Sequence, residues 1–180
     1  MNVRKVSSAS QLAWQLGFLL LLLLTAGALV GSEGWAWGQV QADASLIVDI
    51  RLPRTLGACL AGALLGLAGA LAQGLFRNPL ADPYLLGSAS GASLGVAIGM
   101  VMLSQLDVSP WFVRMGITGM AFMGAWLAVA LTLILSRGVQ HTLRLLLAGV
   151  VVGVVFGAIA SLLLVMFPQI QGSVQSFMLG

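Results

Sequence analysis

The sequence predicts an all-α membrane protein, a polytopic bundle of about five transmembrane helices that form a single membrane domain over residues 1–180. Hydrophobic residues make up 59% of the chain and charged residues only 7%, whereas a soluble domain carries about 25% charged residues. Several apolar runs approach the ~20 residues that cross a bilayer. Glycines recur every fourth residue inside these runs, a spacing that allows close packing between membrane helices.

Five apolar runs are candidates for membrane spans. They cover residues 12–30, 56–75, 85–103, 111–135 and 145–167. The first run follows Arg4 and Lys5, as the apolar part of a secretory signal does, but it is longer than such a segment and further spans follow it. We therefore expect a retained first helix, and we expect the fifth to be closed by Pro168.

The basic residues favour a cytoplasmic N-terminus, because cytoplasmic loops are enriched in lysine and arginine. This orientation places more basic residues inside than outside. The inner ones are Arg4, Lys5, Arg77, Arg137 and Arg144, and the outer ones are Arg51, Arg54 and Arg114. Because the 8 basic residues are scattered along the chain and form no patch, nucleic acid is not an expected partner.

Three spans carry glycine at every fourth position. These glycines are Gly62 and Gly66 in the second span, Gly87, Gly91, Gly95 and Gly99 in the third, and Gly149, Gly153 and Gly157 in the fifth. Residues four apart lie on one face of a helix, and small residues on that face let two helix backbones approach closely. We expect these glycines to serve mainly in helix packing.

The chain carries no residue pattern typical of an enzyme, a metal site or a cofactor site. Its single cysteine, Cys59, and its single histidine, His141, have no partners at metal-ligand spacing. Nucleotide-binding, metalloprotease and hydrolase motifs are absent from the sequence. No charged residue lies near the middle of a predicted span, which disfavours a proton relay.

Arg51 and Arg54 flank Pro53 just before the second span. Two roles are open for them: arginines that reach the lipid headgroups, or a paired basic site for carboxylates of a partner protein. Arginines on the outer side oppose the usual charge bias, and the proline restrains the backbone between them. Both points favour the partner site.

A polar turn with two prolines, residues 77–83, joins the second span to the third. Asn78 in this turn is suited to bonding nearby backbone groups. His141, Thr142 and Arg144 lie at the start of the fifth span, on the same predicted inner side. From these residues alone, an ordinary tight turn and a functional loop are both open.

These segments resemble the FecCD family, the permease subunits of ABC importers for ferric siderophores, haem and vitamin B12. The similar motifs are RLPR at 51–54, NPLADPYLLG at 78–87, SGASLG at 90–95 and LRLLLAGVVVG at 143–153. The resemblance extends from about Leu12 to Gly180.

The resemblance implies a permease component, without a cofactor of its own, in the inner membrane of a bacterium. Its partners, besides membrane lipid, would be a second permease copy or a chain supplying the missing helices, cytoplasmic ATPase subunits and a periplasmic or lipoprotein ligand-binding protein. Arg51 and Arg54 would meet acidic residues of that binding protein. The residues that the resemblance places in the cytoplasmic gate are Asn78, Leu80, Thr142 and Leu143.

Members of the family are nearly twice this length, with about ten helices in two related halves. This chain corresponds to the first half. We expect either that a second polypeptide supplies the other helices, or that the chain is a truncated, non-transporting membrane interaction protein. The motifs do not distinguish siderophore, haem and cobalamin as ligands.

Overall fold

The computed structural model describes residues 9–31, 34–35, 46–103, 109–138 and 141–179 of the chain, and these are almost entirely helical. The α-helices within the described ranges are α1 (Ala9–Leu29), α2 (Leu52–Phe76), α3 (Ser88–Leu103), α4 (Pro110–Leu135), α5 (Thr142–Met166) and α6 (Gln171–Leu179). Shorter elements are the antiparallel pair β1 (Val30–Gly31) and β2 (Gly34–Trp35), the π-helix η2 (Leu46–Arg51), and the 3₁₀-helices η3 (Pro83–Leu86) and η4 (Pro168–Ile170). The predicted all-α membrane fold is confirmed.

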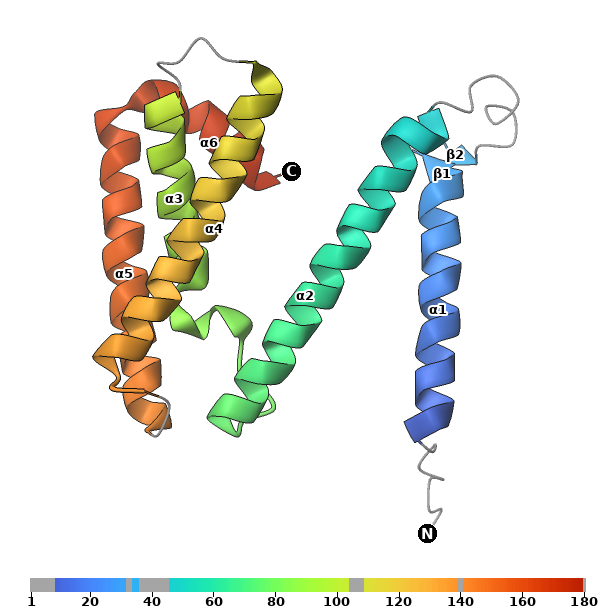
Figure 1. Cartoon of the computed structure of the whole chain (residues 1–180), viewed down its shortest axis with the longest axis horizontal. Helices are drawn as coiled ribbons and strands as arrows, with labels where there is room; N and C mark the ends of the chain where they lie inside the picture. Colours follow the sequence, from blue (N-terminus) through green and yellow to red (C-terminus); the bar gives the residue numbers. More distant parts are fainter. Residues whose placement is uncertain (1–8, 32–33, 36–45, 104–108, 139–140, 180) are drawn as a thin grey trace. The chain divides into compact units, whose positions relative to one another are not determined.

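The described residues divide by their contacts into two compact units, Met1–Leu67 and Ala68–Gly180. The first unit holds α1, the short β pair, η2 and the first part of α2. The second unit contains a three-helix packing of α3, α4 and α5, to which η3 and α6 are added (Figure 1). The single membrane domain over residues 1–180 stays a prediction.

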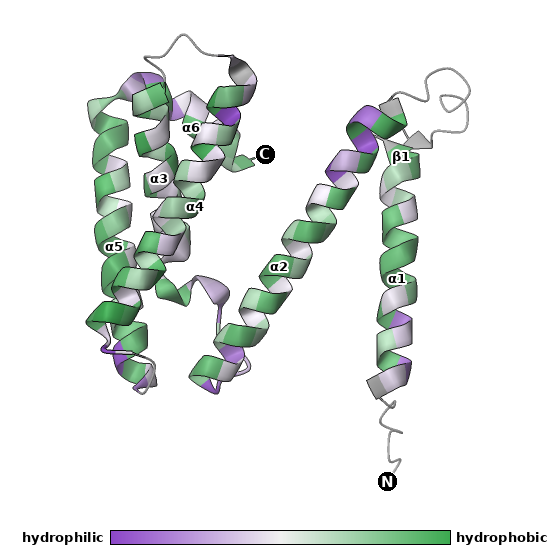
Figure 2. Ribbon diagram, in the orientation of Figure 1, coloured by the Kyte–Doolittle hydropathy of each residue, from purple (hydrophilic) through white to green (hydrophobic). Residues whose placement is uncertain are grey.

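Four helical stretches of the described chain are long and apolar enough to cross a membrane. They are Ser10–Leu29, Ile47–Phe76, Trp111–Leu135 and Thr142–Met166. Apolar residues continue along these helices, and hydrophilic residues gather near several helix ends (Figure 2). Since membrane helices must satisfy their backbone hydrogen bonds internally, long continuous helices are the expected result of such runs.

The third predicted span differs from the prediction, because its α-helix begins at Ser88 and not at residue 85. Gly87 has φ +80°, a left-handed conformation that ends η3 before α3 starts. Glycine adopts this conformation without the steric cost of a Cβ. The resulting helix, Ser88–Leu103, is apolar but shorter than the other four spans.

The core of the second unit lies where α3 packs against α4 and α5. Gly91, Gly95 and Gly99 are all buried on α3. A Cβ at Gly91 would lie 2.9 Å from the carbonyl carbon of Gly124, and one at Gly95 would lie 2.8 Å from that of Met120. A Cβ atom cannot occupy such positions. Glycine at Gly91 and Gly95 therefore permits the short distance between the α3 and α4 backbones.

Helix α6 was not predicted. The chain turns at Pro168 through η4 and continues as α6, whose Val174 is buried. Ile170 and Val174 form an apolar cluster with Val96 of α3 and Ile117 of α4. This cluster holds α6 against the end of the three-helix packing.

We predict that Gly95→Ala destabilises the fold by about 1–3 kcal/mol, the usual cost of overpacking. The new methyl group would meet backbone atoms of Met120 and Ala121, which cannot rotate away. The midpoint of unfolding by denaturing detergent would measure the effect. Gly119→Ala is the matched control on α4, because a Cβ there meets nothing within 4 Å. Equal midpoints for the two variants would contradict the packing account.

Candidate functional site

The turn between α2 and α3 is held by its own backbone and by two side chains. Arg77 takes a left-handed φ of 48°, and the Asn78 N–H donates to the Gln73 carbonyl at 3.1 Å. This is the hydrogen-bond pattern that closes a helix C-terminus, here with arginine where glycine is usual. The Asn78 side-chain oxygen accepts from the Leu80 N–H at 2.9 Å, so Asn78 bonds local backbone, as predicted from its chemistry.

Asp82 begins the next segment. Its carboxylate accepts from the Tyr84 N–H at 2.7 Å and so caps η3, which Pro83 starts. Aspartate at a helix N-cap and proline at the first helical position are both favoured placements. The NPLADP sequence therefore encodes a turn with a defined conformation.

Two contacts tie this turn to the second unit's helices. A Cβ at Gly149 of α5 would lie 3.1 Å from the Leu85 carbonyl carbon, so α5 passes directly against η3. Thr132 of α4, which is 0% exposed, donates its hydroxyl to the Leu86 carbonyl at 3.0 Å. That bond satisfies a carbonyl at the break between η3 and α3, where the helical ladder does not continue.

Three of the four predicted gate residues line one hollow. It has a volume of about 210 Å³ and is bordered by Asn78, Thr142 and Leu143, together with apolar side chains including Leu85 and Leu146. The fourth, Leu80, is not among the lining residues and is 88% exposed. The end of the α2–α3 turn and the start of α5 are thus adjacent in space.

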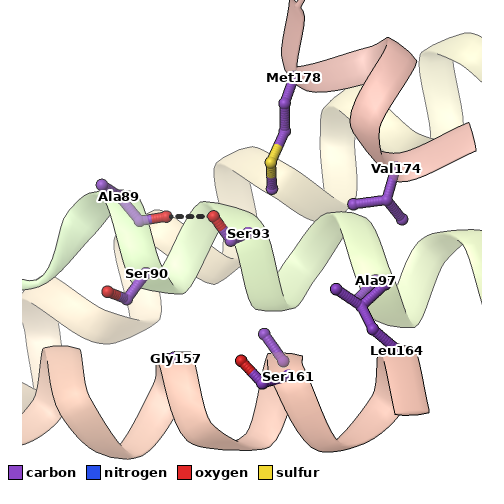
Figure 3. Close-up of a pocket in the computed structure, with 10 residues that line it drawn as sticks. Ala89, Ser90, Ser93, Ala97, Gly157, Ser161, Leu164, Val174 and Met178 are labelled. Atoms are coloured by element: carbon purple, nitrogen blue, oxygen red, sulfur yellow. Dashed lines mark hydrogen bonds between the residues drawn. The ribbon is translucent and has the colours of Figure 1, made fainter. Parts of the chain in front are cut away.

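A second cavity of about 300 Å³ lies between α3, α5 and α6, and three serine hydroxyls are among its lining groups. Ser90 and Ser93 come from α3, and Ser161 comes from α5 (Figure 3). Ser93 donates to the Ala89 carbonyl at 3.0 Å. The lining residues carry no charge, and apart from the three serines they are apolar or glycine, so this cavity is neutral and largely apolar.

The predicted docking arginines lie in the first unit. Arg51 ends η2, and its Nη1 donates to the Leu29 carbonyl at the end of α1 at 3.4 Å. Arg54 lies in the first turn of α2 and is exposed. Arg4 and Lys5, which contributed to the predicted orientation, fall outside the described residues.

The predicted packing glycines fall into different environments. Gly87, Gly91, Gly95, Gly99 and Gly149 are buried. Gly153 and Gly157 lie farther from their neighbours: a Cβ on either would be 3.7 Å or more from the nearest atom, the Ser90 hydroxyl. Gly62 and Gly66 on α2 are exposed, and a Cβ on either would meet nothing within 4 Å among the described residues.

Sequence reasoning missed the partners of the α3 glycines. Gly124, Ala128 and Thr132 recur every fourth residue on α4, and Ser136 continues the series at its C-cap. A Cβ at Gly91 would lie 2.6 Å from the Ala128 methyl group. The spacing of glycine alone does not reveal this series, because only one of its members is glycine. A search for any small residue at a spacing of four would have found it.

No group of three potential metal ligands lies together among the described residues. Cys59 is partly buried within α2. His141 occupies the N-cap position of α5 without a side-chain capping bond. Among the described residues, the arrangement consists of packed helices, a cavity with three serines in its lining, and a hollow between the α2–α3 turn and the start of α5.

Comparison with known proteins gives a consistent result. The profile described as the FecCD transport family matches residues 14–180. The vitamin B12 import system permease protein BtuC of Salmonella paratyphi A is 42% identical over 146 residues, which are 78% of this chain and 43% of that protein. BtuC of Salmonella newport strain SL254 has the same identity and coverage.

A solved structure is also similar. It is described as an inward-facing conformation of a metal-chelate type ABC transporter, with a TM-score of 0.67 and 28% identity. The match covers 87% of this chain and 46% of that one. The chain therefore spans less than half the length of the relatives that it matches.

The fold is that of a multi-pass helical membrane protein, and the matched relatives are described as transport proteins. The chain belongs to the FecCD transport family.

We predict that Thr132→Val destabilises the protein by about 1 kcal/mol, because the Leu86 carbonyl loses the hydrogen bond from the buried Thr132 hydroxyl. Valine keeps the size and branching of threonine, so packing changes little. Thr118→Val is the control, since Thr118 is exposed and bonds only the Arg114 carbonyl of its own helix. Detergent unfolding midpoints would compare them, and an equal loss in both variants would contradict the assigned role.

Proposed function

We propose that the chain is a permease component of an ATP-driven ABC importer for metal-chelate ligands, in the inner membrane of a bacterium. The observation that carries the proposal is the family match over residues 14–180, found in a chain whose α2–α3 turn and α5 start border one hollow. The chain would form part of the translocation pathway and perform no chemistry. ATP hydrolysis would take place on partner ATPase chains.

The proposed mechanism is alternating access. A ligand-binding protein docks on the outer side through Arg51 and Arg54, whose guanidinium groups suit carboxylates. Within the membrane, the uncharged cavity whose lining includes Ser90, Ser93 and Ser161 contributes a neutral stretch of the translocation pathway. On the inner side, the hollow bordered by Asn78 and Thr142 closes or opens as the helix ends move.

In this proposal the N-terminus is cytoplasmic, which places the α2–α3 turn and the start of α5 inside. The helices that the relatives possess beyond the matched region complete the pathway, on the same or a separate polypeptide. A second permease copy faces the first across the pathway. Each of these partners is inferred from the family.

We propose a metal chelate as the ligand, with ferric siderophores as one member of that class. Support comes from the relatives, since one kind is described as importing vitamin B12, itself a cobalt chelate, and another as a metal-chelate type transporter. In this proposal, selection among chelates belongs to the binding protein.

Uptake in cells tests the proposal. Cells lacking their own permease would express this chain with the remaining helices, the ATPase and the binding protein, and would be given radiolabelled cobalamin or a ferric siderophore. We expect ATP-dependent uptake of one of them. Full assembly without uptake of either would contradict the proposal, and a chain that purifies alone would favour the non-transporting interaction protein.

We predict that Arg51→Glu with Arg54→Glu weakens association with the binding protein by about tenfold or more at low salt, because charge reversal opposes the partner's carboxylates. Immobilised permease complex and soluble binding protein would give the affinity. Arg114→Glu is the matched control, since Arg114 is another exposed arginine that is predicted to lie outside. Unchanged affinity in the double variant would contradict the proposed docking role of the two arginines.

We predict that a cross-link between Asn78→Cys and Thr142→Cys, in a Cys59→Ala background, blocks uptake by the complete complex. Both positions border the same hollow, so a short thiol reagent should join them. Each single-cysteine variant should transport normally after the same treatment. Leu80→Cys paired with Thr142→Cys should cross-link less, because Leu80 does not line the hollow. Undiminished uptake at complete Asn78–Thr142 cross-linking would rule out a gate here.

A further inference from the structure

A groove of about 400 Å³ lies between α1 and α2 in the first unit. From α1 it is lined by residues at the spacing of one helix face, from Leu20 to Gly27. From α2 it is lined by Arg54, Thr55, Ala58 and Cys59. Every lining side chain is apolar or small except Arg54 and Thr55.

The two helices make contact at one end of the groove, where Gly27 of α1 meets Thr55 of α2. A Cβ at Gly27 would lie 2.9 Å from the Thr55 methyl group, so glycine permits close approach here. The Thr55 hydroxyl donates to the Arg51 carbonyl at 2.8 Å and is therefore satisfied within its own helix. Arg51 in turn reaches the Leu29 carbonyl of α1.

Arg54 is the charged group of this groove, and it lies at the end where α2 begins. It is exposed, its guanidinium makes no hydrogen bond or ion pair with the described residues, and no carboxylate lines the groove. From Arg54 the lining turns apolar through Ala58 and Cys59 on α2 and through Leu24 and Leu20 on α1. A cationic group at a helix end followed by an apolar channel matches the order of headgroup and acyl chain in a phospholipid.

We propose that this groove binds an anionic phospholipid, with its phosphate on Arg54 and one acyl chain along the leucine face of α1. Guanidinium groups bind phosphate through paired, charge-assisted hydrogen bonds. The apolar lining suits an acyl chain, because lipid is the solvent of these helices. A protein helix without a carboxylate at this level would leave Arg54 without a charge partner.

The site does not depend on the proposed transport function, because the chain alone supplies every lining residue. Arg54 also belongs to the proposed docking pair, and one guanidinium cannot be saturated by a phosphate and a carboxylate together. Lipid binding is therefore measured without the binding protein, so that failure of either proposal is seen separately.

Native mass spectrometry of the full chain, released from bilayers containing phosphatidylglycerol or phosphatidylcholine, tests the site. We expect retained phosphatidylglycerol and little phosphatidylcholine. Arg54→Gln should lower phosphatidylglycerol retention about tenfold, the effect of losing a charge-assisted bond. Arg114→Gln is the control and should retain the lipid. Equal retention by Arg54→Gln and the native chain, or equal retention of both lipids, would overturn the proposal.

A second variant distinguishes the contribution of the apolar groove from that of the headgroup contact at Arg54. Ala58→Leu fills the groove and leaves Arg54 in place, so this variant should also lose the lipid. Ala63 lies on the same helix but outside the groove, so Ala63→Leu should retain the lipid.

A benzophenone maleimide on Cys59 identifies the occupant directly after irradiation. We expect an adduct with the mass of a phospholipid. A protein adduct, or full lipid retention by Ala58→Leu, would overturn the site.

Discussion

The structure of the second unit depends on the close approach of α3 to α4. At Gly91 and Gly95 the backbone of one helix lies against the backbone of the other, and a single added methyl group would collide with main-chain atoms. In a membrane there is no hydrophobic force to drive such helices together, so van der Waals contact and buried hydrogen bonds must supply the attraction. Glycine makes that contact possible.

This packing fixes the position of everything attached to α3. Its N-terminal end is tied by the Gly87 turn, the passage of Gly149 past η3 and the Thr132 hydroxyl bond. As a result the α2–α3 turn is held beside the start of α5, and the hollow bordered by Asn78 and Thr142 lies between two elements that are attached to the packed helices. The proposed gate is therefore built on packed helices, and its movement would require those helix ends to shift.

Much of this fold follows from the sequence, because span length and glycine spacing are direct consequences of the bilayer. The start of α3 does not follow, since the left-handed Gly87 is set by a turn that an apolar run conceals. Helix α6 was missed because its glutamines and serines weaken the hydrophobic signal. The spacing of residues in the turn did not predict which side chains face the hollow. Asn78 borders the hollow, but Leu80, two residues later, does not line it and is exposed.

A distance measurement between spin labels at Leu80 and Leu143 tests the central claim most directly. Both side chains are well exposed, at 88% and 69%, so labels there should leave the packing intact. The label at Leu80 reports the position of the α2–α3 turn, and the label at Leu143 reports the position of the start of α5. The account predicts a single narrow distance distribution for the chain in lipid bilayers without ATP or partner proteins, where the proposed gate does not cycle. A broad distribution would mean that the α3 packing does not hold the turn against α5, and it would contradict the account.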